Sequence, residues 1–399
     1  MIVLFLHRLW PSYGGGETVT KCLANEMIRR GYQVHVLYFK DSVNAGDSIS
    51  VNPLIKSTMI QNVAFDENSK EFFLDKKLAK RVSLELINYV GANHIEIIIN
   101  QWWPVEFHQG VREHTEAKII KCLHMDPNTK KIYEFKGIKK WCFNFIEPLY
   151  RKAETAKHLY SSDKYLRNVD KYIFLAPSFM NYYRKTSKEK NRINKTDFVY
   201  NPLVFEDYIT KEEFEKKGKK VLFVGRLVEG HKKVSRILNI WKRYETDYPN
   251  GEWSLDIVGD GPDKGRYEDF VRTHSLKRIS FYGYQDPRPY YKRASIFLMT
   301  SAYEGWGMTF VESQQNGVVP IGMSTYLAIF DQIENRQNGI IVPPGDENAM
   351  YREMLALMDA PETRRIMAKK GQETCKRYTV DKIVDKWEKI FEELKTKDA

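Results

Sequence analysis

Two glutamates at a regular spacing are the first candidates for chemistry in this chain. Glu304 and Glu312 are separated by seven residues in the segment Glu-Gly-Trp-Gly-Met-Thr-Phe-Val-Glu. Each carboxylate accepts several hydrogen bonds, which suits the hydroxyl groups of a sugar. Gly305 and Gly307 would expose backbone N–H groups to a phosphate or a sugar oxygen. The simpler alternative is that Glu312 only balances the dipole at the start of a helix.

A group of basic residues follows another apolar segment. Arg226 comes shortly after the run Val-Leu-Phe-Val, and Lys232 and Lys233 follow it closely. An arginine can bind two phosphate oxygens at once, and a lysine adds a compact positive charge. The pattern fits a diphosphate site, and solvated surface bases are a comparable interpretation.

Two further candidates lie in the N-terminal half. Gly15 and Gly16 end the turn Pro-Ser-Tyr-Gly-Gly-Gly, where glycine lets the backbone approach a ligand and a following helix favours an anion. A turn that only packs a helix against a strand is about as good an interpretation. His124 ends the apolar run 118–125 and is a binding candidate by its position, although a lone histidine is more often structural.

The elements that must position these residues alternate between short apolar strands and amphipathic helices. Apolar strands separated by helices form parallel sheets covered on both faces, and ligands bind at the carboxyl ends of such strands. A first series of strands is expected at 2–7, 33–39, 95–100, 118–125 and 172–177. A second series is expected at 221–227, 253–259, 279–283, 296–301, 318–322 and 339–343. Helices are expected at 17–30, 74–89 and 380–395, and Asn-Pro near 201–207 marks the join between the series.

The composition excludes several classes of protein. Apolar residues are 42% of the 399 residues and charged residues 29%, which excludes a disordered or fibrous chain. The four cysteines are widely spaced and contain no Cys-x-x-Cys pair, which argues against a zinc ribbon. No apolar run approaches the ~20 residues that span a bilayer, and no basic region precedes the first strand, so we expect a cytosolic protein. The net charge of +11 favours anionic partners, but its bases are scattered, which argues against nucleic acid.

One basic segment stands apart from the strand and helix pattern. Residues 130–157 mix lysine and arginine with tyrosine, tryptophan and phenylalanine. Such a stretch can lie at an anionic membrane surface. The interpretation that we favour is a pair of helices that pack their aromatic side chains on the N-terminal domain.

Taken together, these motifs resemble the retaining glycosyltransferases of family 4, which have the GT-B fold. The resemblance is strongest from about Lys220 to Asn348, through VLFVGRLVEGHKK, LDIVGDGP, ISFYGY, SAYEGWGMTFVESQQNG and NGIIVPPGD. The Glu-x7-Glu pair in that order is the family's signature. The resemblance implies two doubly wound Rossmann-like domains whose parallel sheets face a central cleft. They would be residues 1–202 on the acceptor side and 203–378 on the donor side, with a C-terminal helix at 379–399 that can return to the N-terminal domain.

The resemblance also implies roles for single residues of the second domain. Arg226 and Lys232 look like the pair that binds the donor diphosphate, and Lys233 could share this role. Glu312 looks like the residue that hydrogen-bonds the nucleotide ribose, and Glu304 like the one that faces the donor sugar. The remaining residues implied at the donor are Gly307 and Met308 at the sugar and phosphate, Gly15 and Gly16 over the diphosphate, His124 near the transferred sugar and Tyr284 at the base.

The chain departs from the family's pattern at two places. Residues 323–331 replace a Gly-Gly loop and a following Pro-Glu pair that many relatives carry. Gly230 and His231 precede Lys232 where an acidic or polar residue and a Lys-Gly pair often stand. The acceptor and sugar contacts of the first loop therefore do not transfer from the family.

The resemblance predicts an enzyme that moves a hexosyl group, with retention, from a nucleotide diphosphate sugar to a glycan or lipid-linked acceptor. The donor would be UDP- or GDP-linked, the pathway bacterial surface polysaccharide synthesis, and the location cytoplasmic or peripheral on the inner face of the membrane. No metal or cofactor is expected, because Arg226 and Lys232 would stabilise the leaving diphosphate while His124 and Glu304 act at the sugar. The alternatives are a nucleotide-sugar epimerase of the same fold and a non-catalytic sugar-nucleotide binding protein.

Overall fold

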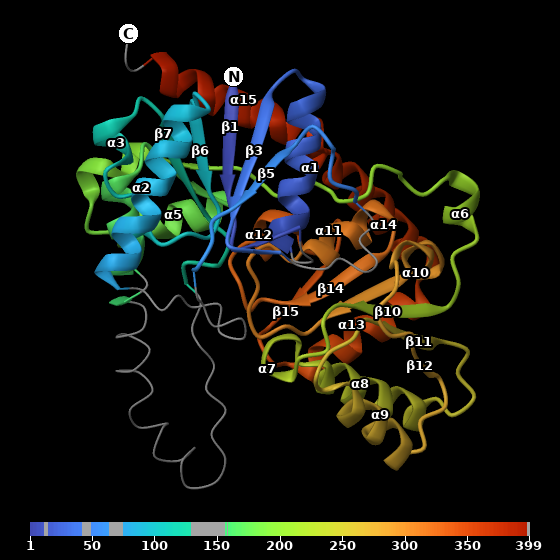
Figure 1. The fold of residues 1–399 in the computed structure, drawn as a ribbon. Coiled ribbons are helices and arrows are strands. Elements are labelled where there is room, and N and C mark those ends of the chain that lie inside the picture. The colour runs from blue at the N-terminus through green and yellow to red at the C-terminus, as the bar shows by residue number, and fades with distance from the viewer. Residues whose placement is uncertain (12–14, 42–48, 64–74, 129–155, 158, 397–399) are drawn as a thin grey trace, which may run out of the picture. The chain divides into compact units, whose positions relative to one another are not determined.

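The computed structural model describes residues 1–11, 15–41, 49–63, 75–128, 156–157 and 159–396. They form two compact units, which are described separately. The first unit comprises Met1–His124, Lys157–Val204 and Val380–Ala399, and the second comprises Met125–Ala156 and Phe205–Thr379. Figure 1 shows a sheet with helices in each unit. Residues 129–155 lie outside the described residues, so our interpretation of the basic segment stays a prediction.

The first unit is built on a seven-stranded parallel sheet with the order β5-β3-β1-β6-β7-β8-β9. Its central strands are buried on both faces, as the apolar runs predicted, and β1 has four residues with no exposure. A two-stranded pair, β2 (Leu9–Trp10) and β4 (Lys40–Asp41), lies beside it. The strands are β1 (Ile2–Leu6), β3 (Gln33–Tyr38), β5 (Lys56–Met59), β6 (Ile97–Asn100), β7 (Lys118–Leu123), β8 (Lys171–Phe174) and β9 (Thr196–Phe198).

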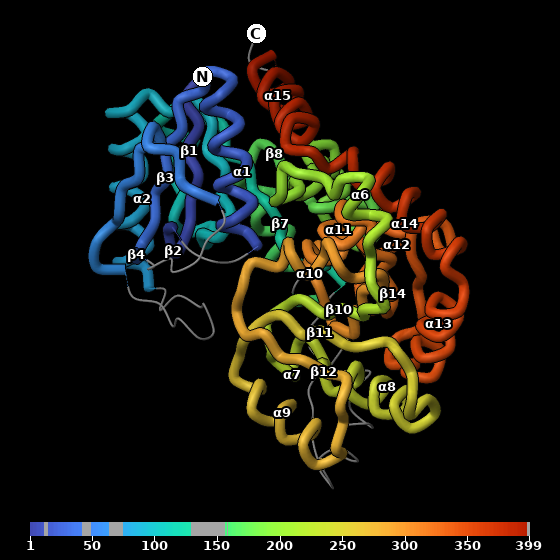
Figure 2. The backbone as a smooth tube through the Cα atoms, turned by 90° about the vertical axis from the view of Figure 1, so that its right-hand side faces the viewer, coloured from blue at the N-terminus to red at the C-terminus, as the bar shows by residue number. Residues whose placement is uncertain are grey.

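The C-terminal helix belongs to the first unit and packs against its first helix (Figure 2). The amphipathic spacing buries Trp387 and Phe391. Arg30 fastens the contact, because its Nη1 lies 2.7 Å from Asp385 Oδ1 and 2.8 Å from Glu388 Oε2. The helices of this unit are α1 (Gly15–Arg29), α2 (Lys76–Ala92), α3 (Val111–His114), α5 (Pro177–Thr186) and α15 (Val380–Thr396), with short 3-10 turns at Val105–His108 and Lys190–Lys195.

The second unit is built on a six-stranded parallel sheet with the order β12-β11-β10-β13-β14-β15. Its strands are β10 (Lys220–Val224), β11 (Ser254–Val258), β12 (Ile279–Phe281), β13 (Ile296–Met299), β14 (Val319–Met323) and β15 (Ile340–Val342). Its helices are α6 (Lys211–Glu215), α7 (Glu229–Lys232), α8 (Val234–Asp247), α9 (Lys264–Thr273), α10 (Arg288–Arg293), α11 (Met308–Gln315), α12 (Ile329–Gln332), α13 (Glu347–Asp359) and α14 (Pro361–Cys375), followed by a 3-10 turn at Lys376–Tyr378.

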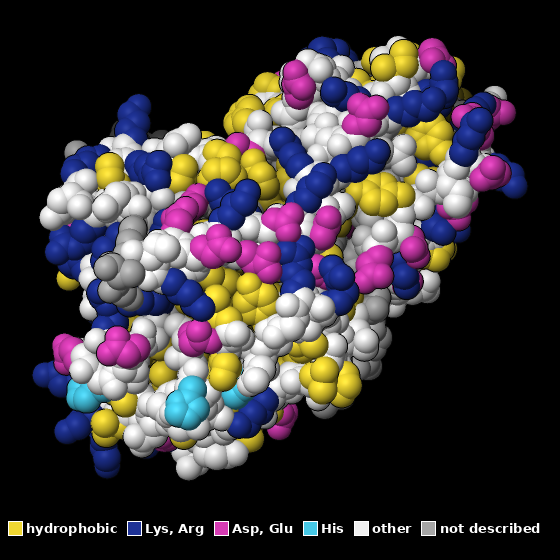
Figure 3. Space-filling view, turned by 90° about the horizontal axis from the view of Figure 1, so that it is seen from above, with side chains coloured by type: hydrophobic (Ala, Val, Ile, Leu, Met, Phe, Trp, Pro, Cys, Tyr) yellow, Lys and Arg dark blue, Asp and Glu magenta, His cyan; other side chains and the backbone are white. Residues whose placement is uncertain are grey.

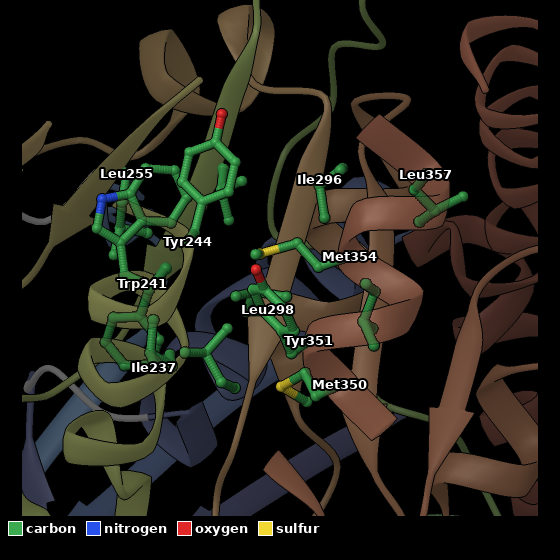
Figure 4. Packing of buried hydrophobic residues seen from close by; sticks show 14 of the residues in the cluster. Ile237, Trp241, Tyr244, Leu255, Ile296, Leu298, Met350, Tyr351, Met354 and Leu357 are labelled. Atoms are coloured by element: carbon green, nitrogen blue, oxygen red, sulfur yellow. The ribbon is translucent and has the colours of Figure 1, made fainter. Parts of the chain in front are cut away.

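The core of the second unit lies where α8 and α13 cover the sheet. Figure 4 shows Met350 and Met354 of α13 beside Leu298 of β13, and Trp241 of α8 in the same cluster. None of these four side chains is exposed to solvent. This packing holds the strands rigidly, so that the loops at their carboxyl ends have a firm base.

The expected strands are present in both sheets, within one to three residues at most ends. Two edge strands, β5 and β9, were not predicted. β5 reads Lys-Ser-Thr-Met and is not buried at any position, so it lacks the apolar run that marks a central strand. Helix α1 begins at Gly15, two residues before the expected start.

Two surface properties bear on partners. None of the helices in the described part of the chain has the length and hydropathy required to cross a membrane. On the face displayed in Figure 3, Lys and Arg side chains are interspersed with Asp and Glu and do not form one continuous basic patch. That distribution agrees with the scattered bases of the sequence.

Candidate active site

A buried ion pair joins the first glutamate of the motif to Lys232. Glu304 lies in the loop between β13 and α11, is 6% exposed, and its Oε1 accepts a hydrogen bond of 2.5 Å from Lys232 Nζ. His231 Nε2 lies 3.7 Å from the same oxygen. Burial acts to raise the pKa of Glu304, but the charge of Lys232 and the hydrogen bonds of both neighbours outweigh it and hold the pKa well below its usual range. Glu304 is therefore a fixed carboxylate.

The second glutamate has a different environment. Glu312 lies within α11, is 7% exposed, and its Oε2 accepts a hydrogen bond of 3.0 Å from the hydroxyl group of Tyr291. Burial raises the pKa of Glu312 to about 7, although Tyr291 and the charge of Lys232 act in the other direction. One glutamate of the pair is thus ionised throughout the neutral range, and the other titrates within it.

The turn between α7 and α8 places Lys232 beside Glu304. Lys233 has φ 53° and ψ 43°, a left-handed conformation that favours glycine. Thr300 at the end of β13 donates its hydroxyl group to the carbonyls of Lys232 and Lys233, at 3.0 Å each. The backbone N–H of Ala302 binds the carbonyl of His231 at 2.7 Å. The turn and the loop that carries Glu304 are therefore fastened together.

Glycines bring three strand-end loops into direct backbone contact. A Cβ atom on Gly259 would lie 2.0 Å from the carbonyl oxygen of Gly225, so no other residue fits there without movement. The N–H of Gly259 also donates to the carbonyl of Gly283 at 2.8 Å. The loops after β10, β11 and β12 thus meet at one edge of the sheet. Arg226 follows Gly225 on the exposed surface, and Tyr284 follows Gly283 with 57% exposure.

The loop that departs from the family's pattern packs against the glycine motif. Gly307 has φ 66° and precedes Met308, the first residue of α11; a Cβ on Gly307 would lie 3.0 Å from the hydroxyl oxygen of Tyr326. That hydroxyl group donates to Gln332 Oε1 at 2.8 Å. The N–H of Leu327 donates to Asp126 Oδ2 at 2.7 Å. Residues 323–331 therefore hold a defined position beside the motif without the Gly-Gly pair.

In the first unit, the expected residues gather around a tryptophan. His124 stacks on Trp102 with ring centroids 4.6 Å apart, and its Nε2 contacts Gln101 Oε1. A Cβ on Gly16 would lie 2.9 Å from Trp102, and the guanidinium carbon of Arg8 lies 4.7 Å from the centre of that ring. Burial lowers the pKa of His124 to about 3, so its ring is neutral. Gly15 precedes this group as the exposed first residue of α1.

The described residues contain no group of three or more His, Cys, Asp or Glu side chains that could hold a metal ion. The two glutamates of the motif form pairs, Glu304 with the Nζ of Lys232 and Glu312 with the hydroxyl group of Tyr291. The chemistry that they offer is hydrogen bonding and charge neutralisation.

Comparison with known proteins shows what the second unit and the fold resemble. Residues 204–374 match the family model described as glycosyl transferases group 1. Among solved structures, the apo form of the lipopolysaccharide outer core galactosyltransferase WaaB aligns over 98% of this chain and 100% of its own, with a TM-score of 0.69 and 18% identity. Residues 204–374 are therefore similar to that family, and the whole chain shares the fold of this solved glycosyltransferase. The matched segment contains Arg226, Glu304 and Glu312.

Other glycosyltransferases extend the similarity over the whole chain. An α-1,4-N-acetyl-D-galactosaminyltransferase of Campylobacter jejuni, named for a GalNAc-GalNAc-diNAcBac-PP-undecaprenol substrate, is 24% identical over 96% of both chains. The lipopolysaccharide 1,6-galactosyltransferase of Salmonella typhimurium is 31% identical, over 37% of this chain and 42% of its own length. Anabaena HepE, solved in complex with UDP and glucose, aligns over 98% of this chain and 100% of its own, with a TM-score of 0.72 and 15% identity.

Sequence reasoning missed several residues of this candidate site. Trp102 could have been found, because it lies two residues after the end of β6 at Asn100, where ligands of parallel sheets bind. Tyr291 carries no such signal, since it lies on α10 and reaches Glu312 only through the tertiary fold. His231 was noted only as a departure, and the structure places it beside Glu304.

Proposed function

We propose that this protein is a retaining glycosyltransferase that moves a hexosyl group from a nucleotide diphosphate sugar to a glycan or lipid-linked acceptor. The process would be the synthesis of a bacterial surface polysaccharide. The observation that carries the proposal is the buried Lys232–Glu304 pair with Glu312 nearby at the carboxyl ends of the second sheet. The names of the Campylobacter and Salmonella relatives support the acceptor class, and the UDP complex of HepE supports the donor class.

The donor would be bound by complementary charges. Lys232 and the exposed Arg226 would bind the diphosphate, with Lys233 adjoining them. Glu304, ionised through its pair with Lys232, would accept hydrogen bonds from hydroxyl groups of the transferred sugar. Glu312 would accept hydrogen bonds from the ribose. Tyr284 would lie at the base, and the backbone at Gly307 and Met308 at the sugar and phosphate.

The reaction would break the bond between the anomeric carbon and the leaving phosphate oxygen. Negative charge then develops on the diphosphate, where Arg226 and Lys232 would stabilise it without a metal ion. The acceptor oxygen would attack from the face that the diphosphate leaves, and a phosphate oxygen would take the acceptor proton, so that configuration is retained. His124 is neutral and would hydrogen-bond the sugar. Gly15 and Gly16 would bind the diphosphate through their backbone.

A thermal-shift panel tests the donor class first. UDP, GDP, ADP and their common sugar conjugates are added with and without EDTA. A ligand that binds only the folded protein raises its stability by RT ln(1 + [L]/Kd), so one nucleotide should stand out and EDTA should not abolish the shift. The proposal fails if no nucleotide shifts the melt at about millimolar concentration, about a thousand times a typical micromolar Kd.

Activity then separates the proposal from an epimerase. The stabilising sugar nucleotide is incubated with and without undecaprenyl-diphosphate-linked saccharides, and the product linkage is assigned by NMR. A transferase consumes donor in proportion to acceptor and gives the anomeric configuration of the donor, whereas an epimerase converts the donor alone. Arg226→Ala should weaken nucleotide binding and turnover by about tenfold or more, the order expected for a lost charged phosphate contact. Lys292→Ala, which removes a surface base paired with Glu213, is the control.

Binding to membranes tests the proposed location. The protein is mixed with neutral vesicles and with vesicles that contain about one third anionic lipid, an amount at which basic segments contribute about 1 kcal/mol per residue. We expect the protein to sediment with the anionic vesicles and not with the neutral ones. Replacing the lysine and arginine residues within 130–157 should abolish this binding. Equal behaviour with both vesicle types would contradict a peripheral location.

A further inference from the structure

Tyr291 combines a fully buried ring with a hydroxyl group aimed at α11. It lies on α10 and has no exposed surface. Its hydroxyl oxygen is 3.0 Å from Glu312 Oε2 and 3.3 Å from the carbonyl oxygen of Thr309. The ring is flanked by Phe205 and Phe297, whose centroids lie 6.3 Å and 6.2 Å away. This packing fixes the position of the hydroxyl oxygen beside Glu312, while its hydrogen can still rotate about the C–O bond.

We propose that Tyr291 is a positioning residue that holds the carboxylate of Glu312 ready for the donor nucleotide and makes donor affinity depend on proton concentration in the neutral range. This inference rests on the proposed function, because it assumes that Glu312 contacts the nucleotide. Tyr291 itself is too deeply buried to touch the substrate.

The groups that act on Glu312 are few. Burial raises the pKa of its carboxyl group, while the hydrogen bond from Tyr291 on α10 and the charge of Lys232 on α7 lower it. Burial and the neighbouring Glu312 raise the pKa of Tyr291 well above its usual value, so the phenol stays a neutral donor. Gly371 and Gln372 of α14, Phe297 of β13 and Gly322 of β14 pack against α11 and carry no charge.

The second oxygen near the phenol makes both protonation states of Glu312 acceptable. When Glu312 is ionised, the phenol donates to the carboxylate. When Glu312 is protonated, the phenol can turn its hydrogen toward the carbonyl of Thr309 and accept the proton of the carboxyl group. In either state the phenol and the Glu312 oxygen that faces it keep a hydrogen bond, so the equilibrium between the two states can follow pH.

Affinity for the nucleotide should follow the ionised fraction of Glu312. Ribose hydroxyl groups donate hydrogen bonds, and a carboxylate accepts them better than a neutral carboxyl group does. Removal of the phenolic hydroxyl takes away a contact that stabilises the carboxylate, so the pKa of Glu312 should rise. A rise of about one unit lowers the ionised fraction at pH 7 from about one half to about one tenth, a loss of about fivefold.

The test compares two neighbouring tyrosines. Tyr291→Phe removes only the hydroxyl group that contacts Glu312. Tyr290→Phe removes a hydroxyl group from the same helix whose partner is Gln285 Oε1, at 2.6 Å. Binding of UDP, with GDP in parallel, is measured by calorimetry from about pH 6 to about pH 9. This range brackets the pKa of Glu312, which is about 7. Y291F should bind about fivefold more weakly at pH 7 and recover at the highest pH, whereas Y290F should follow the wild type throughout.

Two glutamate variants keep the outcomes apart. Glu312→Gln cannot ionise and should bind weakly at every pH, apart from the titration of the nucleotide phosphate. If E312Q and E312A bind like the wild type, the proposed function of this site is wrong. If both are weakened but Y291F matches the wild type at all pH values, or is weakened equally at all of them, only the role of Tyr291 is overturned. Should Y291F unfold early, an affinity difference between the wild type and E312Q that does not change with pH overturns the inference.

Discussion

The candidate sites of the two units differ in the kind of titratable group that they bury. In the first unit, burial lowers the pKa of His7, His108 and His124 to about 3 and that of Lys121 to about 7. In the second unit the two buried groups of the motif are carboxylates, Glu304 and Glu312. Both sets lie in apolar surroundings on sheets of the same architecture, but only the second contains a buried ion pair at the motif.

The difference shows what burial alone does and what a partner adds. Burial disfavours charge, so the histidines of the first unit are neutral donors and acceptors. Glu304 keeps its charge because Lys232 lies 2.5 Å away and neutralises it. A fixed charge suits the binding of an ionic diphosphate sugar, and neutral groups suit hydroxyl groups of a saccharide. This division of roles is what the following predictions can break or sharpen.

The largest expected effect comes from replacing one buried lysine in each unit by methionine. Lys232→Met leaves Glu304 buried without its partner and should lower the free energy of unfolding by about 3–5 kcal/mol. Lys121→Met removes a lysine that burial already discharges in part, and whose Nζ donates to the carbonyl of Gln101 at 2.9 Å. The Lys121→Met substitution should raise the free energy of unfolding by about 1–2 kcal/mol. It removes the cost of burying the lysine amine, and we expect that cost to exceed the value of the one hydrogen bond that is lost. Urea denaturation of both variants checks this, and effects of equal sign would contradict the comparison.

Acid should weaken the first unit more than the second. The three histidines are neutral in the folded protein and bind protons in the unfolded chain. Their contribution to the free energy of unfolding is therefore present above about pH 6.5 and is lost as the pH falls below that value. Lowering the pH by about one unit from there should cost about 1 kcal/mol for each histidine. Glu312 binds its proton more tightly when folded, so it contributes stability that is lost as the pH rises through about 7.

Amide hydrogen exchange measures the local stability of each sheet separately. Protection of β1 and β7 should fall between about pH 7.5 and about pH 5.5, after correction for the intrinsic exchange rate, while protection of β10 and β13 changes less. His108→Leu is an informative variant, because neither ring nitrogen of His108 has a hydrogen-bond partner among the described residues. It should reduce the acid sensitivity of the first sheet. An equal loss of protection in both sheets would contradict the proposed difference between the two units.

The smallest effect concerns two left-handed residues, one in each unit. Lys233 has φ 53° and His94 has φ 50°, and both conformations favour glycine. Lys233→Gly and His94→Gly should each raise the free energy of unfolding by about 0.5–1 kcal/mol, the relieved strain less the entropy that glycine gains in the unfolded chain. Only K233G should also weaken nucleotide binding, because Lys233 adjoins Lys232. Thermal melts with and without UDP separate the two effects, and a loss of binding in H94G would contradict this.

How far the sequence leads can be judged from particular residues. The run Ile2–Leu6 predicts a central strand because every one of its side chains is apolar, and β1 is that strand. β5 was not predicted, because an edge strand with a Lys-Ser-Thr sequence needs no apolar run. The seven-residue spacing of Glu304 and Glu312 indicated sugar chemistry, but it could not tell the two carboxylates apart.

The sequence by itself determined the alternation of strands and helices, the two parallel sheets and the strand-end motifs, because these depend on local periodicity and on residue types. The tertiary structure alone decided which side chains share a buried site. Lys232 meets Glu304 across 72 positions, and Tyr291 meets Glu312 across 21. Those contacts arise when the sheet packs its crossovers side by side, and the resulting burial sets the charge that each group carries. No local pattern encodes that burial.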